Sequence, residues 1–236
     1  MNRLVVLRSL SGWLATLLLL TSASALNAQV DNQLYDPVPP EDSAYLRIIN
    51  ASHEGAVDTW VDGKLRGKNL ASGDAGDYLV VPMGKHKIVL QVKEKSTLKL
   101  TANLVAERGR AMTLAVTDLQ AGSKPLIFED RINPNKLKAV LAIYHLLPNL
   151  GSIDVESTDK KVKVFSNLAF GSTNQLLVNP ITIELSALKS GEKVELAKAN
   201  LAMQHGNAYS LLVLQNENSK PILRVVENKI ERYSKY

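Results

Sequence analysis

Residues 69–82, NLASGDAGDYLVVP, decide the fold because a close copy of them returns further along the chain. The copy, NLAFGSTNQLLVNP, occupies residues 167–180 and is identical at seven of the fourteen positions. Both copies keep the first glycine, the Leu-Val pair and the closing proline, while both aspartates and the second glycine are replaced. The shared residues suit a turn that leads into a strand, because glycine adopts backbone conformations that other residues avoid. We therefore interpret both stretches as a structural corner rather than a ligand-binding loop.

The repeat extends to both sides of this corner. ANLVAERGRAMTLAV, which begins at Ala102, aligns with ANLAMQHGNAYSLLV, which begins at Ala199. Upstream, AYLRIIN from Ala44 aligns with AVLAIYH from Ala139. Self-similarity at a nearly constant spacing is the mark of tandem copies of one structural unit. The sequence therefore predicts two mutually homologous domains in tandem.

Each copy has the pattern of β-strands. Apolar residues alternate with polar or small ones, a period of two, as in the run from Leu98 to Leu104. Asp62-Gly63 is a dipeptide that tight hairpin turns accept. No convincing amphipathic helix pattern follows the amino-terminal segment, and about seven or eight short strands per copy are typical of an immunoglobulin-like β-sandwich. We predict an all-β protein with two tandem, mutually homologous immunoglobulin-like β-sandwich domains.

The first 28 residues have the features of a secretory signal peptide. Arg3 and Arg8 precede a short apolar block, residues 13–20, and small residues follow, with cleavage expected after Ala25 or Ala28. The block is too short to span a bilayer stably, and the mature chain contains no second apolar run of sufficient length. We therefore expect a mature periplasmic protein without a transmembrane segment. Since the chain has no cysteine, its fold does not depend on disulfides in that oxidising compartment.

These patterns divide the chain into six segments. They are a signal peptide (1–28), an extended proline-rich lead-in (29–42), the first β-sandwich domain (43–130), a linker (131–138), the second β-sandwich domain (139–228) and a charged tail (229–236). We expect the tail either to fray or to dock on a partner. Without Arg3 and Arg8, 26 basic residues stand against 23 acidic ones, a net charge of +3 that gives no indication of nucleic-acid binding.

Residues for catalysis or metal binding are scarce. No two histidines have the spacing of an HxH or HExxH pair, and the GxSxG motif of serine hydrolases is absent. The nearest approach to a calcium loop, at Asp74 and Asp77, is not reproduced in the second copy. We therefore predict no catalytic residue, no metal site and no cofactor. The histidines are His53, His86, His145 and His205.

Trp60 is the side chain that most suggests binding. In VDTWV, residues 57–61, alternation turns the odd-numbered residues inward and places Asp58 and Trp60 on the outward face. An exposed tryptophan beside a carboxylate suits stacking and hydrogen bonding with a sugar ring, so we predict that Trp60 and Asp58 bind carbohydrate. The alternative is that Trp60 packs under a loop or at the interdomain contact. The matching position in the second copy is Glu156, so such a site belongs to the first domain alone.

The run LYDPVPPEDSAYLRIINAS, residues 34–52, resembles the start of mature proteins of the AlgF family. The resemblance rests on the Leu-Tyr-x-Pro opening, the second proline, the short acidic turn and the strand ending in Asn-Ala. It implies a two-domain β-sandwich protein, similar in shape to carbohydrate-binding modules, that assists alginate O-acetylation in the periplasm. The partners it implies are SGNH-type acetyltransferases and a membrane-bound O-acyltransferase. The family supplies no catalytic motif.

The leading hypothesis is a non-catalytic adaptor in exopolysaccharide O-acetylation that bridges the acetyltransferase partners, the polymer, or both. The alternative is a structural or adhesive β-domain protein of the cell envelope, unrelated to acetylation. A third hypothesis, an esterase acting on acetylated glycan, requires a serine and a histidine brought together by the fold. The resemblance does not determine which polysaccharide is modified.

Overall fold

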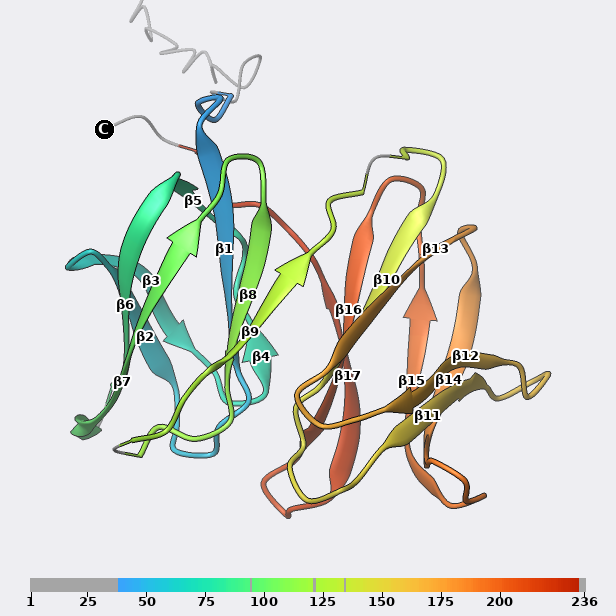
Figure 1. The fold of residues 1–236 in the computed structure, drawn as a ribbon. Helices are drawn as coiled ribbons and strands as arrows, with labels where there is room; N and C mark the ends of the chain where they lie inside the picture. Colours follow the sequence, from blue (N-terminus) through green and yellow to red (C-terminus); the bar gives the residue numbers. More distant parts are fainter. Residues whose placement is uncertain (1–37, 94, 121, 134, 234–236) are drawn as a thin grey trace, which may run out of the picture. The chain divides into compact units, whose positions relative to one another are not determined.

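A computed structural model describes residues 38–233, apart from residues 94, 121 and 134. The predicted signal peptide and most of the lead-in therefore lie outside the described residues. Within the described ranges the chain forms seventeen β-strands and no helix, so the all-β prediction is confirmed (Figure 1). It follows that no helix of the described part is long and apolar enough to cross a membrane.

Nine strands belong to the first half of the chain and eight to the second. The first nine are β1 (Ser43–Asn50), β2 (Val57–Val61), β3 (Lys64–Leu70), β4 (Asp74–Ala75), β5 (Leu79–Pro82), β6 (Gly84–Val92), β7 (Lys95–Ala106), β8 (Ala111–Val116) and β9 (Leu126–Asp130). The others are β10 (Ala139–His145), β11 (Ile153–Ser157), β12 (Lys163–Leu168), β13 (Thr173–Val178), β14 (Thr182–Lys189), β15 (Glu195–Ala202), β16 (Ala208–Gln215) and β17 (Pro221–Glu227).

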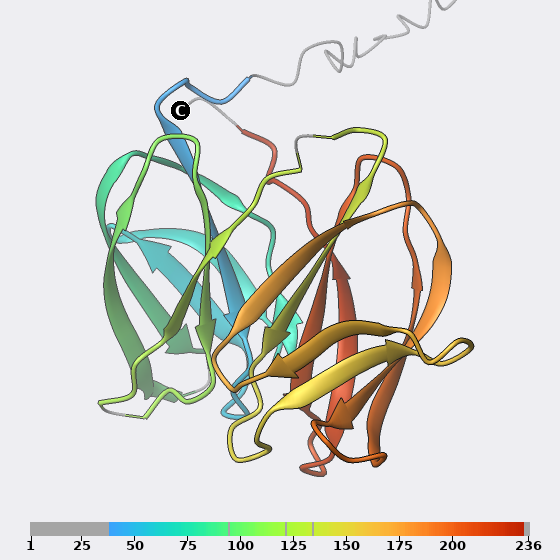
Figure 2. The same ribbon diagram turned by 45° about the vertical axis from the view of Figure 1, so that its right-hand side comes forward.

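The two halves have matching sheets, which can be followed in Figures 1 and 2. The order β3-β2-β6-β7 in the first half corresponds to β12-β11-β14-β15 in the second. Likewise β4-β1-β8-β9 corresponds to β13-β10-β16-β17, and β5 also pairs with β1. In each half the first strand pairs in parallel with a late one, β1 with β8 and β10 with β16. The internal repeat of the sequence is therefore also a repeat of topology.

Each half buries one apolar core between its two sheets, and a third apolar cluster joins the halves. The joining cluster draws on β1, β8 and β9 from one side and β10 and β16 from the other. The sheets that contain these strands, here called the inner sheets, are therefore buried on both faces. This explains why AVLAIYH in β10 is apolar almost throughout and buried at every position. The other two sheets, called the outer sheets, keep one face toward solvent. Buried and less buried residues therefore alternate along strands such as β2 and β6.

The repeated corner has the same backbone geometry in both copies. Asn69 and Asn167 have positive φ angles of 56° and 49°. Gly73 and Gly171, four residues later, have φ angles of 76° and 74°. These are left-handed conformations that asparagine and glycine adopt most readily, which accounts for their retention in both copies. The backbone geometry agrees with the interpretation of this stretch as a structural corner.

After the corner, the edge strand of the first copy has one residue more than the strand that it pairs with. Ile49 of β1 faces Ala75 and Leu46 faces Leu79, so four steps along the edge correspond to three along β1. In the second copy, β13 pairs with β10 without such an interruption. Such a bulge redirects the backbone away from regular pairing. Tyr78 follows the bulge, and its backbone N–H donates to the carbonyl oxygen of Lys229 at 2.7 Å.

The charged tail therefore docks, at least in part, on the first half of its own chain. Ile230 forms a parallel bridge with Tyr78, and the N–H of Glu231 donates to the carbonyl oxygen of Tyr78 at 2.9 Å. The carboxylate of Glu231 accepts the N–H of Val80 at 2.7 Å and pairs with the guanidinium of Arg66. We call residues 229–231 the strap, because they connect the end of the second half to the edge of the first.

A buried arginine lies between the two inner sheets. Arg47, on β1, has only 1 % of its surface exposed. Its Nε donates to Thr113 at 3.0 Å, while its Nη atoms donate to Ser210 and to the Tyr144 hydroxyl, both at 2.9 Å. Nη1 also donates to Asn228 at 2.6 Å. One guanidinium therefore binds side chains of both halves, in keeping with the rule that buried charges need full hydrogen bonding.

The counter-charge of Arg47 is Asp130, which is also buried. Thr113 donates to the Asp130 carboxylate at 2.6 Å, Tyr78 donates to it at 2.9 Å, and Tyr144 donates to its other oxygen. Hydroxyl groups therefore link the cation to the anion. Burial raises the pKa values of Tyr78 and Tyr144 far above their ordinary range, so both hydroxyls keep the proton that they donate.

We expect Arg47→Ala to lower the free energy of unfolding by about 3–5 kcal/mol, because it leaves the Asp130 carboxylate buried without its cation. Urea denaturation of the mature chain measures the loss. Arg110→Ala is the control, since its ion pair with Glu129 lies on the surface and contributes at most about 1 kcal/mol. Similar losses in the two variants would contradict the role given to Arg47.

Candidate functional site

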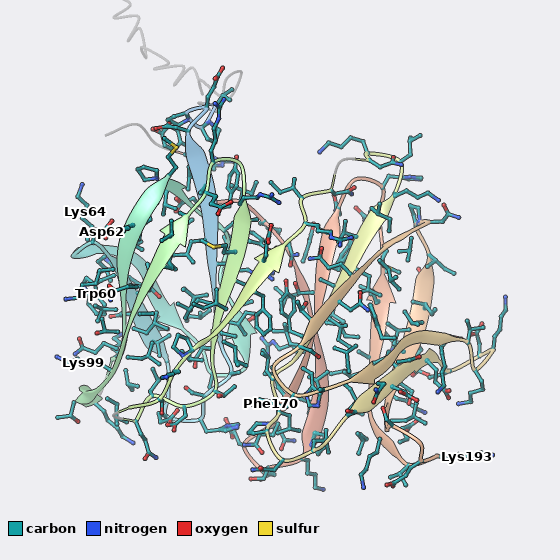
Figure 3. The ribbon with its side chains drawn as sticks, in the orientation of Figure 1. Trp60, Asp62, Lys64, Lys99, Phe170 and Lys193 are labelled. Atoms are coloured by element: carbon teal, nitrogen blue, oxygen red, sulfur yellow. The ribbon has the colours of Figure 1, made fainter. Side chains whose placement is uncertain are left out.

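Trp60 lies on the outward face of the first outer sheet. In β2 the odd-numbered residues are buried, whereas Asp58 and Trp60 are half-buried, as the alternation predicts. Figure 3 shows Trp60 and Lys99 on the outer side of this sheet. Trp60 is not part of the apolar cluster that joins the two halves. Packing under a loop stays the alternative to a binding role.

An apolar row crosses the sheet at Trp60. The strand register places Leu65 of β3 on one side of Trp60 and Val89 of β6 on the other, and Thr101 of β7 follows Val89. Leu65 is 40 % exposed, while Val89 is half-buried. We call these four residues the Trp60 row. Neighbouring strands lie about 4.8 Å apart, so the row spans roughly 14 Å of flat surface.

Lysines flank the Trp60 row on both sides. Lys87 of β6 lies two residues from Val89 and faces Asn103, while Lys99 of β7 lies two residues from Thr101 and faces Gln91. Lys85 and Val105 form the next pair beyond Lys87. A shallow hollow of about 590 Å³ opens at this end of the sheet, where Val105 is 59 % exposed. We call the outward side chains of β2, β3, β6 and β7 the Trp60 face.

The outward lysines of the Trp60 face stand outside the ion pairs of the described residues. Lys85, Lys87 and Lys99 have no carboxylate within 4 Å there. The nearby carboxylates serve the backbone instead. Asp58 accepts the N–H of Asn69 at 2.7 Å.

Asp62 has a comparable structural role in the β2–β3 hairpin. It accepts the N–H of Lys87 at 2.8 Å, and its other oxygen lies 2.7 Å from Nδ1 of His86. The hydrogen bond from Lys87 is the main cause, and that with His86 the second, of an Asp62 pKa below its usual value. Both aspartates near Trp60 are thus engaged in holding the hairpin and the corner.

The equivalent face of the second half has the opposite character. The register positions that match Leu65, Trp60, Val89 and Thr101 are occupied by Lys163, Glu156, Ser186 and Lys198. Charged side chains there are paired with one another. The pairs are Lys163 with Asp154, Lys161 with Glu156 and Lys198 with Glu195. The Trp60 row is therefore the point at which two copies of one scaffold differ most in surface chemistry.

Asp58 and its counterpart Asp154 share one structural task. Asp154 accepts the N–H of Asn167 at 2.8 Å, just as Asp58 accepts that of Asn69. Asp58, which the sequence pattern paired with Trp60 as a sugar-binding residue, thus supports the corner, as Asp154 does in the second copy. The prediction that Trp60 and Asp58 bind carbohydrate stays a prediction.

The structure gives three of the four histidines structural contacts. Nε2 of His86 lies 2.8 Å from the carbonyl oxygen of Pro82, and Nε2 of His145 lies 2.8 Å from that of Gly151. Nδ1 of His205 lies 3.1 Å from the carbonyl oxygen of Leu137. Within the described ranges no three histidine, aspartate or glutamate side chains form a group that could hold a metal ion. The histidines are thus spread over the fold rather than gathered in one site.

The model of one protein family, described as alginate O-acetyl transferase AlgF, matches residues 15–210. The chain belongs to the AlgF family. A relative named alginate biosynthesis protein AlgF, from Pseudomonas syringae pv. tomato, is 24 % identical over 189 residues, which cover 80 % of this chain and 78 % of the relative. The protein of the same name from Pseudomonas putida is 27 % identical over 193 residues, covering 81 % and 82 %. The resemblance seen in residues 34–52 is thereby confirmed.

Among solved structures, the carboxy-terminal domain of AlgF from P. aeruginosa is similar to part of this chain. It matches with a TM-score of 0.33 and 20 % sequence identity, covering 39 % of this chain and 100 % of that domain. Membership of the AlgF family rests on the sequence match, which extends over both halves.

The corner support gives a pH-dependent prediction. The N–H of Asn167 is the main cause, and Lys163 the second, of an Asp154 pKa lowered to about 2. Since the unfolded value is about 3.9, the stabilisation is complete above that pH and is lost as the pH falls through about 2. We expect Asp154→Asn to lower the free energy of unfolding by about 1–2 kcal/mol at pH 7, and the difference from the unmodified chain to shrink below pH 4.

Urea denaturation between pH 7 and pH 2.5 measures this difference. Glu217→Gln, in an exposed turn, is the control and changes the free energy of unfolding by less than about 0.5 kcal/mol. A deficit in Asp154→Asn that stayed constant over the whole range would rule out the carboxylate as its cause.

Proposed function

We propose that the mature chain is a non-catalytic periplasmic adaptor in the O-acetylation of an exopolysaccharide, with alginate as the first polymer to test. In this role it bridges an SGNH-type acetyltransferase and a membrane-bound O-acyltransferase complex, or holds one of them to the polymer. Membership of the AlgF family supports the pathway, because the relatives are named alginate biosynthesis proteins. The predicted signal peptide supports the compartment.

The contrast between the two outer sheets carries the adaptor proposal. Both sheets have the same strand order and the same corner support, so that folding does not require the Trp60 row. The second half places ion-paired side chains at the matching positions. An outward-facing row of Leu65, Trp60 and Val89 has no corresponding structural reason. Solvent-facing apolar surface rimmed by polar residues marks interaction sites. The first half therefore differs where an adaptor needs a binding surface.

The contacts of the histidines support a role without catalysis. A general base must be free to reach substrate, yet His86 and His145 are buried, and each bonds to the backbone next to its own strand. Burial also lowers the pKa of His145, which keeps its ring neutral as a structural hydrogen-bonding group. The description of the AlgF family as an O-acetyl transferase is then understood as participation in the acetylation system rather than as chemistry on this chain.

Deletion of the gene tests the proposal directly. We expect the acetyl content of the secreted polymer to fall to that of a strain without the periplasmic acetyltransferase, while the amount of polymer stays similar. Complementation with the unmodified gene restores acetylation. Unchanged acetyl content in the deletion strain would overturn the proposal and favour a structural role in the cell envelope.

The non-catalytic part has a separate test. We expect purified mature protein to release no acetate from a chromogenic acetyl ester or from acetylated polymer, in an assay where an SGNH-type esterase serves as positive control. Hydrolysis that a single serine substitution abolishes would replace the adaptor with an esterase.

A further inference from the structure

We infer that the Trp60 face is a protein-docking surface, and that its partner presents an apolar centre surrounded by acidic side chains. This inference rests on the proposed adaptor function and specifies which surface performs it. It follows from the arrangement of apolar and charged residues on the first outer sheet and from the way its carboxylates are used.

The apolar centre contains a tryptophan, a residue type that is enriched at the hot spots of protein interfaces. Trp60 lies in the middle of its row, between Leu65 and Val89, and all three belong to strands of a sheet that is braced by an apolar core. A central tryptophan on a rigid scaffold is a typical anchor of a protein interface. Flat sheet surface, with a half-buried ring held between strands, needs little reordering on binding.

The charges around the centre point to an acidic partner. Lys87 and Lys99 are exposed and lie on either side of the row, at register positions two residues away. The two aspartates near the row, Asp58 and Asp62, accept the backbone N–H groups of Asn69 and Lys87. The rim carries Lys85, Lys87 and Lys99 against these two carboxylates and is therefore positive overall. A complementary surface carries aspartate or glutamate at its own rim.

Three features favour a protein over a polysaccharide chain. A sugar ring stacks on an aromatic plane, and the row offers one aromatic ring with an aliphatic side chain on each side. The acceptor that would orient sugar hydroxyls, Asp58, is occupied by the backbone. The shallow hollow of about 590 Å³ beside Lys85 and Val105 offers a protein partner further contact area at one end of the sheet.

The test uses the mature chain and the purified SGNH-type acetyltransferase of the same bacterium. Trp60→Ala removes the anchor, and we expect it to raise the dissociation rate of the complex about tenfold or more. The double variant Lys87→Glu with Lys99→Glu reverses the rim, and we expect an association rate about tenfold lower at low salt, with the difference shrinking as salt is added.

A matched control is available on the second half. Lys189→Glu with Lys198→Glu makes the same change in net charge on exposed lysines of the other outer sheet. We expect its association and dissociation rates to stay within about threefold of the unmodified chain, because non-interface charges have small effects. Urea denaturation of every variant verifies that the fold is kept, so that a lost interaction is not confused with unfolding.

The possible results distinguish the docking inference from the adaptor function on which it rests. Binding of the acetyltransferase that the Trp60 face variants leave unchanged would overturn the inference and keep the adaptor function. Absence of any complex would overturn both.

A titration with polymer tests whether the Trp60 face binds polysaccharide instead of protein. Trp60 is the one tryptophan after the predicted signal peptide, since the other is Trp13, so that the tryptophan fluorescence of the mature chain, excited selectively over its tyrosines, reports on this face. We expect polymannuronate at millimolar concentration to leave that fluorescence unchanged. Quenching by the polymer, lost in the double lysine variant, would assign the face to polysaccharide and overturn protein docking.

Discussion

The hydrogen-bonded bridge from Arg47 to Asp130 is the constraint on which the arrangement of the two halves depends. Both charges are buried, and burial of an ion is costly unless its hydrogen-bonding capacity is filled. The groups that fill it come from both halves, with Thr113 and Ser210 at matching positions of β8 and β16. The apolar cluster of the inner sheets supplies much of the attraction, and the bridge specifies one alignment of those sheets, because a shifted alignment would leave the ions unpaired.

Because the inner sheets hold the two halves together, the side chains on the open faces of the outer sheets are free to differ. Each inner sheet packs against the other inner sheet on one face and against an apolar core on the opposite face. Nearly every position along β1, β8, β10 and β16 is therefore constrained. The outer sheets are constrained on one face only. On the open face, one copy carries the Trp60 row and lysines that form no ion pair with the described residues, while the other carries paired charges. Divergence of a duplicated unit is easiest on such a face, and a binding function can arise there without altering the core.

Much of the architecture could be predicted from the sequence, because local patterns of residues determine it. The period of two indicated strands, the repeated corner indicated a duplication, and alternation placed Trp60 outward. The buried bridge could not be predicted, because its contacts join residues that are far apart, such as Arg47 and Ser210. One signal was present: Arg47 is flanked by apolar residues in both phases of its strand, from Ala44 to Ile49, and a charge in such a run requires a buried partner.

The candidate site was predictable in position and less so in chemistry. The pattern identified Trp60 correctly as outward, but Asp58 belongs to the corner, a contact that depends on the left-handed backbone at Asn69. The lysine rim and the aliphatic neighbours of Trp60 depend on strand register, which no local pattern determines. Bulges in the pairing of β2 with β3 make that register still harder to infer.

The strap makes the two copies of the repeat structurally unequal. In open tandem arrays each repeat contacts only its neighbours. Here the residues directly after β17 return to the first copy, where Glu231 binds Val80 and Arg66 beside the bulge. The second copy has no such bulge in its edge strand. The copies are therefore not interchangeable: a segment inserted between β17 and residue 229 would separate the strap from the edge that it binds.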